Sequence, residues 1–250
     1  EIRKYKPNWV IFLTCFPNFK LDAQVAEAAK KVDKKIKTAC MSLSMLSLQN
    51  PKKIMEELTY IDYIPWGEPE FALMQLIKGK NPAKVQGIYY RDSKGKIKFS
   101  SGMTHQIRNL DELGIPVHSA MPYKIYKCPM ALRLPMAIIC CSRGCINRCV
   151  HCQAGNFQNP IRYRSVESVI QELEELKKLN IKEIKFYDFS FTTNPTFLKA
   201  LCKKMIEKKY NFTWHCNARA EFIKPDILKL MKISGCHTVA IGCESSNNEI

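Results

Sequence analysis

Three cysteines form a C-x3-C-x2-C array at Cys145, Cys149 and Cys152. Cysteine is the usual protein ligand of iron–sulfur clusters, so three thiolates from one short loop can hold three irons of a four-iron cluster. The fourth iron then has no protein ligand, and an open coordination position lets a metal centre bind substrate. The array therefore predicts a [4Fe-4S] cluster with one open iron. The alternatives are a structural zinc ion and buried free thiols.

The cysteine content of the whole chain fits metal binding better than a disulfide framework. The chain has 12 cysteines in 250 residues. In a small secreted domain that count would suggest disulfides, but this chain is large, lysine-rich and alternates strand and helix patterns. The cysteines that stand apart from the array are expected to be buried free thiols. They are Cys15, Cys40, Cys128, Cys202 and Cys236.

The second half of the chain must position the array, and its pattern predicts repeated strand–helix units. Apolar runs predict strands over 136–141, 181–187, 212–216 and 238–243, with helices over 165–179, 195–209 and 225–233 between them. Asp188, Arg219 and Glu244 follow the second, third and fourth strands, as the array follows the first. In (β/α) barrels the chemistry lies at the carboxyl ends of the strands, so these residues are expected to converge. Arg219 and Glu244 could instead pair with each other at the surface.

The first half predicts a separate parallel-sheet domain. Strands are expected over 9–15, 35–41 and 60–65, helices over 21–32, 51–57 and 67–77, and a hairpin over 86–91 and 96–99. Prolines interrupt the pattern between residues 100 and 134, which predicts a connection. The expected organisation is an α/β chain with a Rossmann-like domain over 1–100, a linker over 101–134, and the first four strands of a (β/α) barrel over 135–250.

Charge and hydropathy bear on partners and location. A net charge of +16 fits either a nucleic-acid partner or solvated helix faces. The second is favoured, because the lysines interleave with acids and no aromatic–basic stripe is present. Without an apolar run long enough for a membrane span, or a signal peptide, a soluble cytoplasmic protein is expected. We also expect that Glu1 to Ile250 is a segment of a longer protein.

Residues 136–250 resemble the radical SAM superfamily. The likeness is carried, in the family's order, by Ser142-Arg-Gly-Cys145 with the array, Arg162-Tyr-Arg-Ser165, Phe186-Tyr-Asp188, Cys216-Asn-Ala-Arg219 and Gly242-Cys-Glu-Ser245. Residues 1–100 resemble, more loosely, the Rossmann-like cobalamin-binding domain that precedes the barrel in one subgroup. That likeness is carried by Pro7-Asn8-Trp9-Val10, Ile61-Asp62-Tyr63, Gly67-Glu68-Pro69-Glu70 and Gly87-Ile-Tyr-Tyr-Arg91.

The resemblance implies a cofactor set and a role for each strand-end residue. The three array cysteines would ligate the [4Fe-4S] cluster, and its open iron would chelate the amino and carboxylate groups of S-adenosylmethionine (SAM). Asp188 would accept from the amino group, Arg219 would pair with the carboxylate, and Glu244 would accept from the ribose. One electron, from a reductant such as flavodoxin or ferredoxin, would cleave SAM to a 5′-deoxyadenosyl radical that acts on a small-molecule or peptide substrate. No residue is assigned to substrate chemistry.

The subgroup resemblance also implies cobalamin and methylation of an unactivated carbon, but two departures weaken it. Phe189 stands where many members carry a second acid, and no Gly-Gly stretch follows Ala39-Cys40-Met41, where glycines let the backbone approach the corrin. No D-x-H-x-x-G motif is present either. The alternatives are a degenerate cobalamin domain in a cyclase or rearrangement enzyme, and a tRNA methylthiotransferase. A non-enzymatic alternative is a structural metal module or electron carrier.

Overall fold

The computed structural model divides the chain into two compact units, Glu1–Ile107 and Arg108–Ile250. The structure describes residues 1–14, 18–42, 50–104, 106–149, 151–152 and 160–247. The division lies within the segment that the sequence predicts as a connection. The part of that segment after Ile107 packs into the second unit, where His118 contacts Glu172 at 2.8 Å.

The first unit is built on a five-stranded mixed sheet with strand order β1-β2-β3-β4-β5. Its strands are β1 (Trp9–Thr14), β2 (Lys37–Ser42), β3 (Tyr63–Pro65), β4 (Ile88–Arg91) and β5 (Ile97–Phe99). The first three strands are parallel, and β4 and β5 form the predicted antiparallel hairpin.

Helices cover both faces of this first sheet. They are α1 (Ile2–Tyr5), α2 (Phe19–Asp22), α3 (Gln24–Val32), α4 (Pro51–Glu57) and α5 (Glu70–Ile77), with a 3-10 turn η2 (Pro82–Lys84). One apolar cluster joins α3 and α4 to the sheet around Cys40 and Met55, and a second joins α5 to it around Leu73 and Ile88. Three consecutive residues of β2, Thr38, Ala39 and Cys40, are fully buried, as expected for a strand that is covered on both faces.

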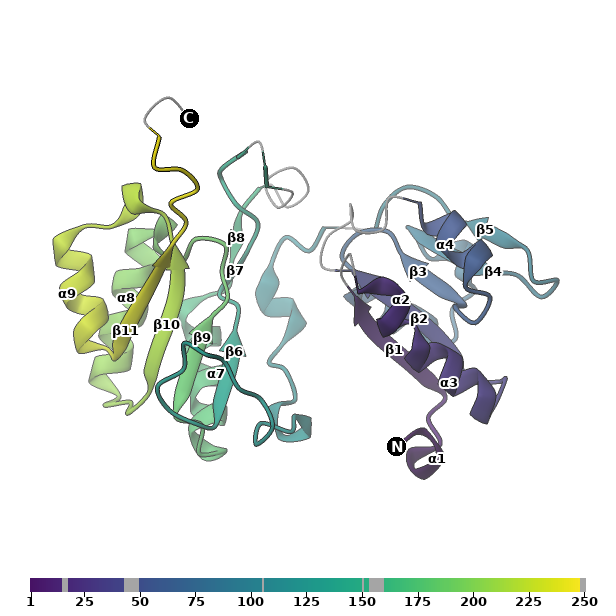
Figure 1. Ribbon diagram of the computed structural model, residues 1–250, viewed down its shortest axis with the longest axis horizontal. Coiled ribbons are helices and arrows are strands. Elements are labelled where there is room, and N and C mark those ends of the chain that lie inside the picture. Colours follow the sequence, from purple (N-terminus) through teal and green to yellow (C-terminus); the bar gives the residue numbers. More distant parts are fainter. Residues whose placement is uncertain (15–17, 43–49, 105, 150, 153–159, 248–250) are drawn as a thin grey trace. The chain divides into compact units, whose positions relative to one another are not determined.

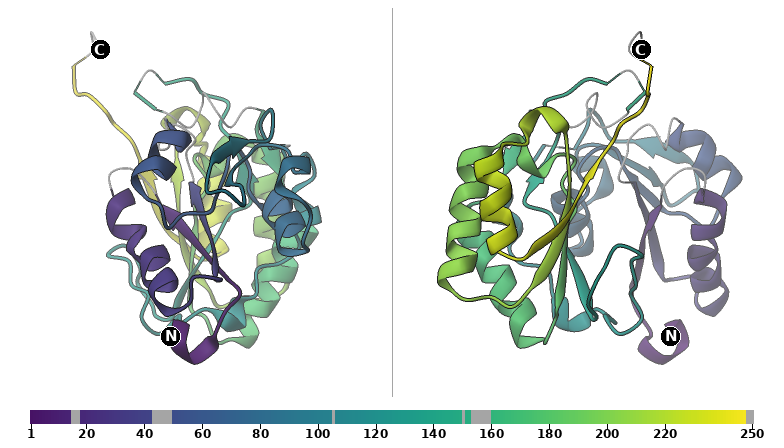
Figure 2. Two further views of the ribbon diagram at one scale, coloured as in Figure 1. Left: turned by 90° about the vertical axis from the view of Figure 1, so that its right-hand side faces the viewer. Right: turned by 60° about the vertical axis from the view of Figure 1, so that its left-hand side comes forward.

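The second unit has a four-stranded parallel sheet with strand order β11-β10-β9-β6. Its strands are β6 (Met136–Ile139), β9 (Glu183–Phe186), β10 (Thr213–Ala218) and β11 (Cys236–Ile241). Helices α7 (Val166–Lys178), α8 (Pro195–Glu207) and α9 (Pro225–Ile233) lie on one face of it (Figures 1 and 2). Short 3-10 turns complete the unit: η3 (Leu110–Leu113), η4 (His118–Ala120), η5 (Phe191–Thr193) and η6 (Ala220–Phe222). The predicted α/β fold class is confirmed.

The two faces of the second sheet differ in character. Ile139, Phe186, Trp214 and Cys216 point toward the helices and are fully or almost fully buried. The alternate positions point to the other face, and Ile138 among them is 53% exposed. That face would be the interior of a (β/α) barrel.

Three of the helices begin where the sequence predicts. The side chains of Asn50, Ser165 and Asn194 accept hydrogen bonds from the backbone N–H three residues later, at 2.9 to 3.0 Å. Each satisfies an N–H that the first turn leaves without a helical partner. Among the described residues, we find no helix with the length and apolar character that a membrane span needs. The cytoplasmic location stays a prediction.

Candidate functional site

The cysteine array lies in a loop that is closed by a short antiparallel strand pair. β7 (Ser142–Arg143) pairs with β8 (Arg162–Tyr163), with Ser142 opposite Tyr163 and Arg143 opposite Arg162. This pair and the segment after β11 extend from the same end of the sheet (Figure 1). Pattern analysis missed both strands because two-residue strands have no periodicity to detect. The pairing fixes both ends of the array loop relative to the sheet.

The three array thiols differ in burial from the cysteine that precedes them. Cys145, Cys149 and Cys152 are free and partly exposed, whereas Cys141 just before them is fully buried. In an iron–sulfur cluster each cysteine binds a different iron, and three accessible free thiols in one loop are suitable ligands for such a cluster.

Arg219 connects the end of β10 to the array. Its Nη1 lies 3.1 Å from the Cys149 sulfur, while its Nε and Nη2 donate to the two oxygens of Glu221 at 2.9 and 3.2 Å. Glu221 first, and Cys149 second, raise the pKa of Arg219. The guanidinium thus stands at the array, as the strand-end pattern predicts. Its carboxylate partner in this state is Glu221, which sequence reasoning missed.

Glu244 reaches the array from the end of β11. Its backbone is in the left-handed region with φ of 51°, and its carboxylate folds back so closely that a Cβ on Gly242 would lie 2.5 Å from it. Glu244 Oε2 lies 3.8 Å from Nε2 of His151, the histidine inside the array, and both side chains are exposed. The structure therefore pairs Arg219 and Glu244 with different partners and not with each other.

Asp188, at the end of β9, is placed differently from the other strand-end residues. It is 2% exposed, its Oδ1 accepts from the Ser142 hydroxyl at 2.5 Å, and its Oδ2 accepts from the Cys141 N–H at 3.2 Å. Burial raises the pKa of its carboxyl to about 6. Both oxygens thus hold the chain that enters the array. Contact with the SAM amino group stays a prediction. For that contact, one oxygen of Asp188 would have to accept a second hydrogen bond.

A buried ionic network contacts the chain where it leaves the first strand of the sheet and enters the array loop. Arg164 donates to the carboxylate of Glu172 and, at 3.3 Å, to the carbonyl of Cys140 at the end of the first strand. Burial would raise the pKa of Glu172, but hydrogen bonds from His118 and Arg164 outweigh it and lower that pKa. The sequence alone could have indicated this network, because Glu172 is a charged residue on the apolar face of α7, between Val169 and Leu176.

Comparison with known proteins agrees with this arrangement. Residues 139–250 match the radical SAM superfamily. The whole chain is 30% identical to an uncharacterized methyltransferase of Pyrococcus horikoshii and covers 54% of it. Over 211 residues, 78% of this chain, it is 26% identical to the anaerobic magnesium-protoporphyrin IX monomethyl ester cyclase of Cereibacter sphaeroides, of which it covers 33%.

A solved structure shows the same fold. The radical SAM methyltransferase TsrM from Kitasatospora setae superposes with a TM-score of 0.73 at 15% identity, covering 99% of this chain and 51% of that one. The chain thus spans about half the length of TsrM and of the P. horikoshii protein. The match identifies residues 139–250, which include the cysteine array, as a radical SAM domain.

Proposed function

We propose that this chain is the SAM-cleaving part of a cobalamin-dependent radical SAM enzyme that methylates an unactivated carbon. The observation that carries the proposal is the contact of Arg219 with Cys149 at 3.1 Å, because it brings a carboxylate-binding guanidinium to the array. Cys145, Cys149 and Cys152 would hold the [4Fe-4S] cluster in this proposal. When bound and reduced by a flavodoxin or ferredoxin, the cluster would supply one electron for the cleavage of SAM to a 5′-deoxyadenosyl radical.

The residues around the array bind and orient SAM. A guanidinium fork matches a carboxylate with two parallel hydrogen bonds, and Arg219 already binds Glu221 in this way. The SAM carboxylate would replace Glu221 there, since the two are chemically equivalent. Glu244 is exposed and reaches over Gly242, which suits an acceptor for the ribose hydroxyls. Asp188 acts by holding Cys141 and Ser142, and hence the start of the array loop.

Cobalamin is supported by the likeness of the fold. TsrM has been solved with cobalamin and a [4Fe-4S] cluster, and the match covers 97% of this chain. Parallel sheets bind cofactors at the carboxyl ends of their strands, where the loops after β1 and β2 lie. The region that lacks the Gly-Gly stretch, after Met41, falls largely on 43–49, outside the described residues.

Two other enzyme activities are less well supported. A cyclase or rearrangement enzyme agrees with the C. sphaeroides relative and requires only the SAM-cleaving part of the proposal. A methylthiotransferase needs three further cluster cysteines in the first unit. Cys40 is fully buried, and burial raises the pKa of its thiol to about 12, so it is a core residue and not a ligand. Cys15 lies outside the described residues.

Production of 5′-deoxyadenosine tests the proposal. The protein is reconstituted with iron and sulfide without oxygen, reduced with dithionite and supplied with SAM. We expect 5′-deoxyadenosine from the wild type and none from Cys149→Ala. The matched control is Cys243→Ala, which removes an exposed thiol outside the array and should retain product formation. Absence of SAM cleavage, with a cluster spectrum that SAM does not change, would overturn the proposal.

Two further measurements separate the alternatives. Corrin absorption in the purified protein, lost on cobalamin depletion, distinguishes the methylating version from one with a degenerate first unit. SAM cleavage without corrin absorption would favour the cyclase class. A fourth protein ligand to iron, seen as a cluster spectrum that is indifferent to SAM, would favour the electron carrier.

A further inference from the structure

A second group of metal-ligating side chains lies in the second unit, on the sheet face away from the helices. Among the described residues, Glu183, His215 and His237 are a set whose ligand atoms all lie within 4.8 Å of one another. The carboxylate oxygen Oε1 of Glu183 lies 2.9 Å from Nδ1 of His215 and 2.7 Å from Nε2 of His237. Each residue comes from a different strand, β9, β10 and β11, so tertiary structure assembles the group.

The group is separate from the cysteine array. Glu183 is the first residue of β9, whereas Asp188, which holds the array loop, comes five positions later beyond its other end. At about 3.3 Å per residue, that separation is roughly 16 Å along the strand. The group therefore lies toward the amino ends of the strands, and the cluster site lies at their carboxyl ends.

Burial makes a counter-charge necessary. Glu183 and His215 are both fully buried, and the His237 side chain is 12% exposed. An ionised carboxylate is costly to bury unless a positive charge is paired with it. Within the described part of the chain, the Glu183 carboxylate is hydrogen-bonded to Thr213, His215 and His237, and to no lysine or arginine. A divalent cation or an imidazolium proton would supply the charge.

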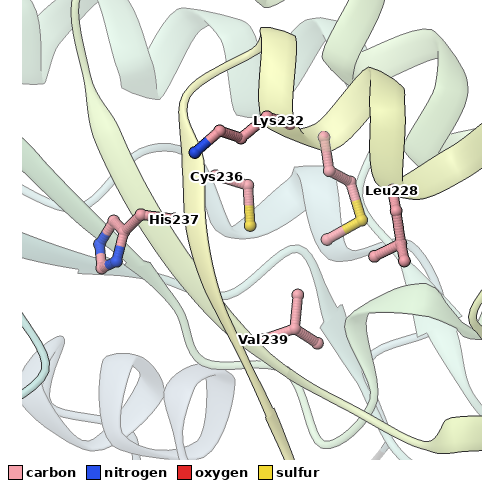
Figure 3. Close-up of a pocket in the computed structure, with 6 residues that line it drawn as sticks. Leu228, Lys232, Cys236, His237 and Val239 are labelled. Atoms are coloured by element: carbon pink, nitrogen blue, oxygen red, sulfur yellow. The ribbon is translucent and has the colours of Figure 1, made fainter.

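Each of the three side chains also contacts a second polar group through its other polar atom. The other ring nitrogen of His215, Nε2, faces the Cys128 sulfur at 3.9 Å, and the other ring nitrogen of His237, Nδ1, faces the Thr238 hydroxyl at 2.8 Å. The second oxygen of Glu183 accepts from the Thr213 hydroxyl. Metal-binding histidines and carboxylates in proteins are oriented by outer partners of this kind. Figure 3 shows the imidazole of His237 directed away from Leu228 and from helix α9, which agrees with its place on the sheet face opposite the helices.

We propose that Glu183, His215 and His237 bind a divalent transition-metal ion of the zinc class, separate from the array and independent of the proposed SAM chemistry. Two imidazole nitrogens and one carboxylate oxygen are a ligand set that zinc commonly takes, with a fourth position left for water. The partial exposure of His237 provides the side from which water reaches it. Binding would tie β9, β10 and β11 together at their amino ends.

The test uses cobalt as an optical probe, in protein whose array has been removed by Cys145→Ala, Cys149→Ala and Cys152→Ala so that the array cannot bind metal. We expect one equivalent of Co²⁺ to give the visible absorption of a four-coordinate site without thiolate bands, and Zn²⁺ to displace it. Adding His237→Gln should weaken Co²⁺ binding at least about tenfold. The matched control, His151→Gln, removes an exposed histidine outside the group and should not change it.

Two measurements distinguish loss of the metal site from misfolding of a variant. Circular dichroism should show equal helix content in all variants without metal. Zn²⁺ should raise the melting temperature of the array-free protein, and Glu183→Gln, which is nearly isosteric, should abolish that rise. In cluster-loaded wild type, elemental analysis after chelation and desalting should find one zinc per chain beside the iron. Absence of stoichiometric Co²⁺ binding, or binding that His237→Gln leaves intact, would show that the group is held by hydrogen bonds alone and overturn the proposal.

Discussion

The carboxylate of Asp188 accepts a 2.5 Å hydrogen bond from the hydroxyl of Ser142, so the segment after β9 holds the first residue of β7, the strand that leads into the array loop. Arg219 and Glu244 reach the array from the next two strand ends by different contacts. The carboxyl edge of this sheet therefore carries one buried acid that positions the array loop, a partly exposed arginine that contacts Cys149 and an exposed glutamate beside His151.

The burial of Asp188 makes the stability of the second unit depend on pH. An unfolded aspartate has a pKa near 3.9, and burial raises the folded value to about 6, so the folded protein binds this proton more tightly. The stability contribution of Asp188 therefore falls as pH rises from about 4 to about 6 and stays low above it. Asp188→Asn has no such titration. Its free energy of unfolding should rise relative to wild type across that window, by up to about 3 kcal/mol.

Urea denaturation of Asp188→Asn and wild type at a series of pH values measures this difference. The control is Asp226→Asn, an exposed site where Lys199 lowers the carboxyl pKa. Its stability relative to wild type should change with the opposite sign, since a lowered pKa stabilises the fold above the unfolded value. A flat difference for Asp188→Asn would contradict the prediction.

Glu221 competes with the SAM carboxylate for Arg219. Removing its charge by Glu221→Gln frees the fork of Arg219 that now makes contacts at 2.9 and 3.2 Å. An exposed ion pair contributes about 1 kcal/mol at most, which corresponds to about a fivefold gain in SAM affinity. Isothermal titration of SAM into cluster-loaded protein measures it. Glu207→Gln, at the end of α8 and away from the site, should leave affinity unchanged. Weaker SAM binding in Glu221→Gln would instead mean that Glu221 contacts SAM itself.

The buried network of Arg164, Glu172 and His118 should contribute strongly to stability. Glu172→Gln leaves the buried Arg164 without its carboxylate, and breaking a buried ion pair costs about 3 to 5 kcal/mol. The matched control is Glu175→Gln on the same helix, whose pair with Lys178 is exposed to solvent and should therefore contribute far less to stability. Guanidinium denaturation measures both variants. Equal effects of the two substitutions would show that the network does not act as a buried ion pair.

Gly235 is required by the turn that leads into β11. Its φ is 107°, and a Cβ there would lie 2.2 Å from the carbonyl oxygen of Phe212. Gly235→Ala should cost about 2 kcal/mol or more, since both backbone strain and a clash with the main chain result. Gly79→Ala is the control: its φ is 85°, but a Cβ would meet nothing within 4 Å, so about 1 kcal/mol is expected. Thermal denaturation that ranks Gly79→Ala as the more damaging would contradict this assignment.

Local chemistry in the sequence determined most of the elements and the location of the site. Asn50, Ser165 and Asn194 mark helix starts because a side-chain oxygen two or three residues before an N–H can bond it whatever the rest of the fold does. Apolar runs likewise predicted the strands to within a few residues, because they too are a local feature of the sequence. Three thiols within eight residues determined the array, because their spacing along the chain keeps them together in space.

Contacts between distant residues were decided only by the tertiary structure. Ser142 and Tyr163 pair across 21 positions, Arg219 reaches Cys149 across 70, and Glu183 meets His237 across 54. No periodic pattern encodes such contacts, since they depend on strand order and register. Burial was also decided by the tertiary structure. Asp188, Arg219 and Glu244 all follow strands in the sequence, yet packing buries Asp188 and leaves Arg219 partly exposed and Glu244 exposed at the array.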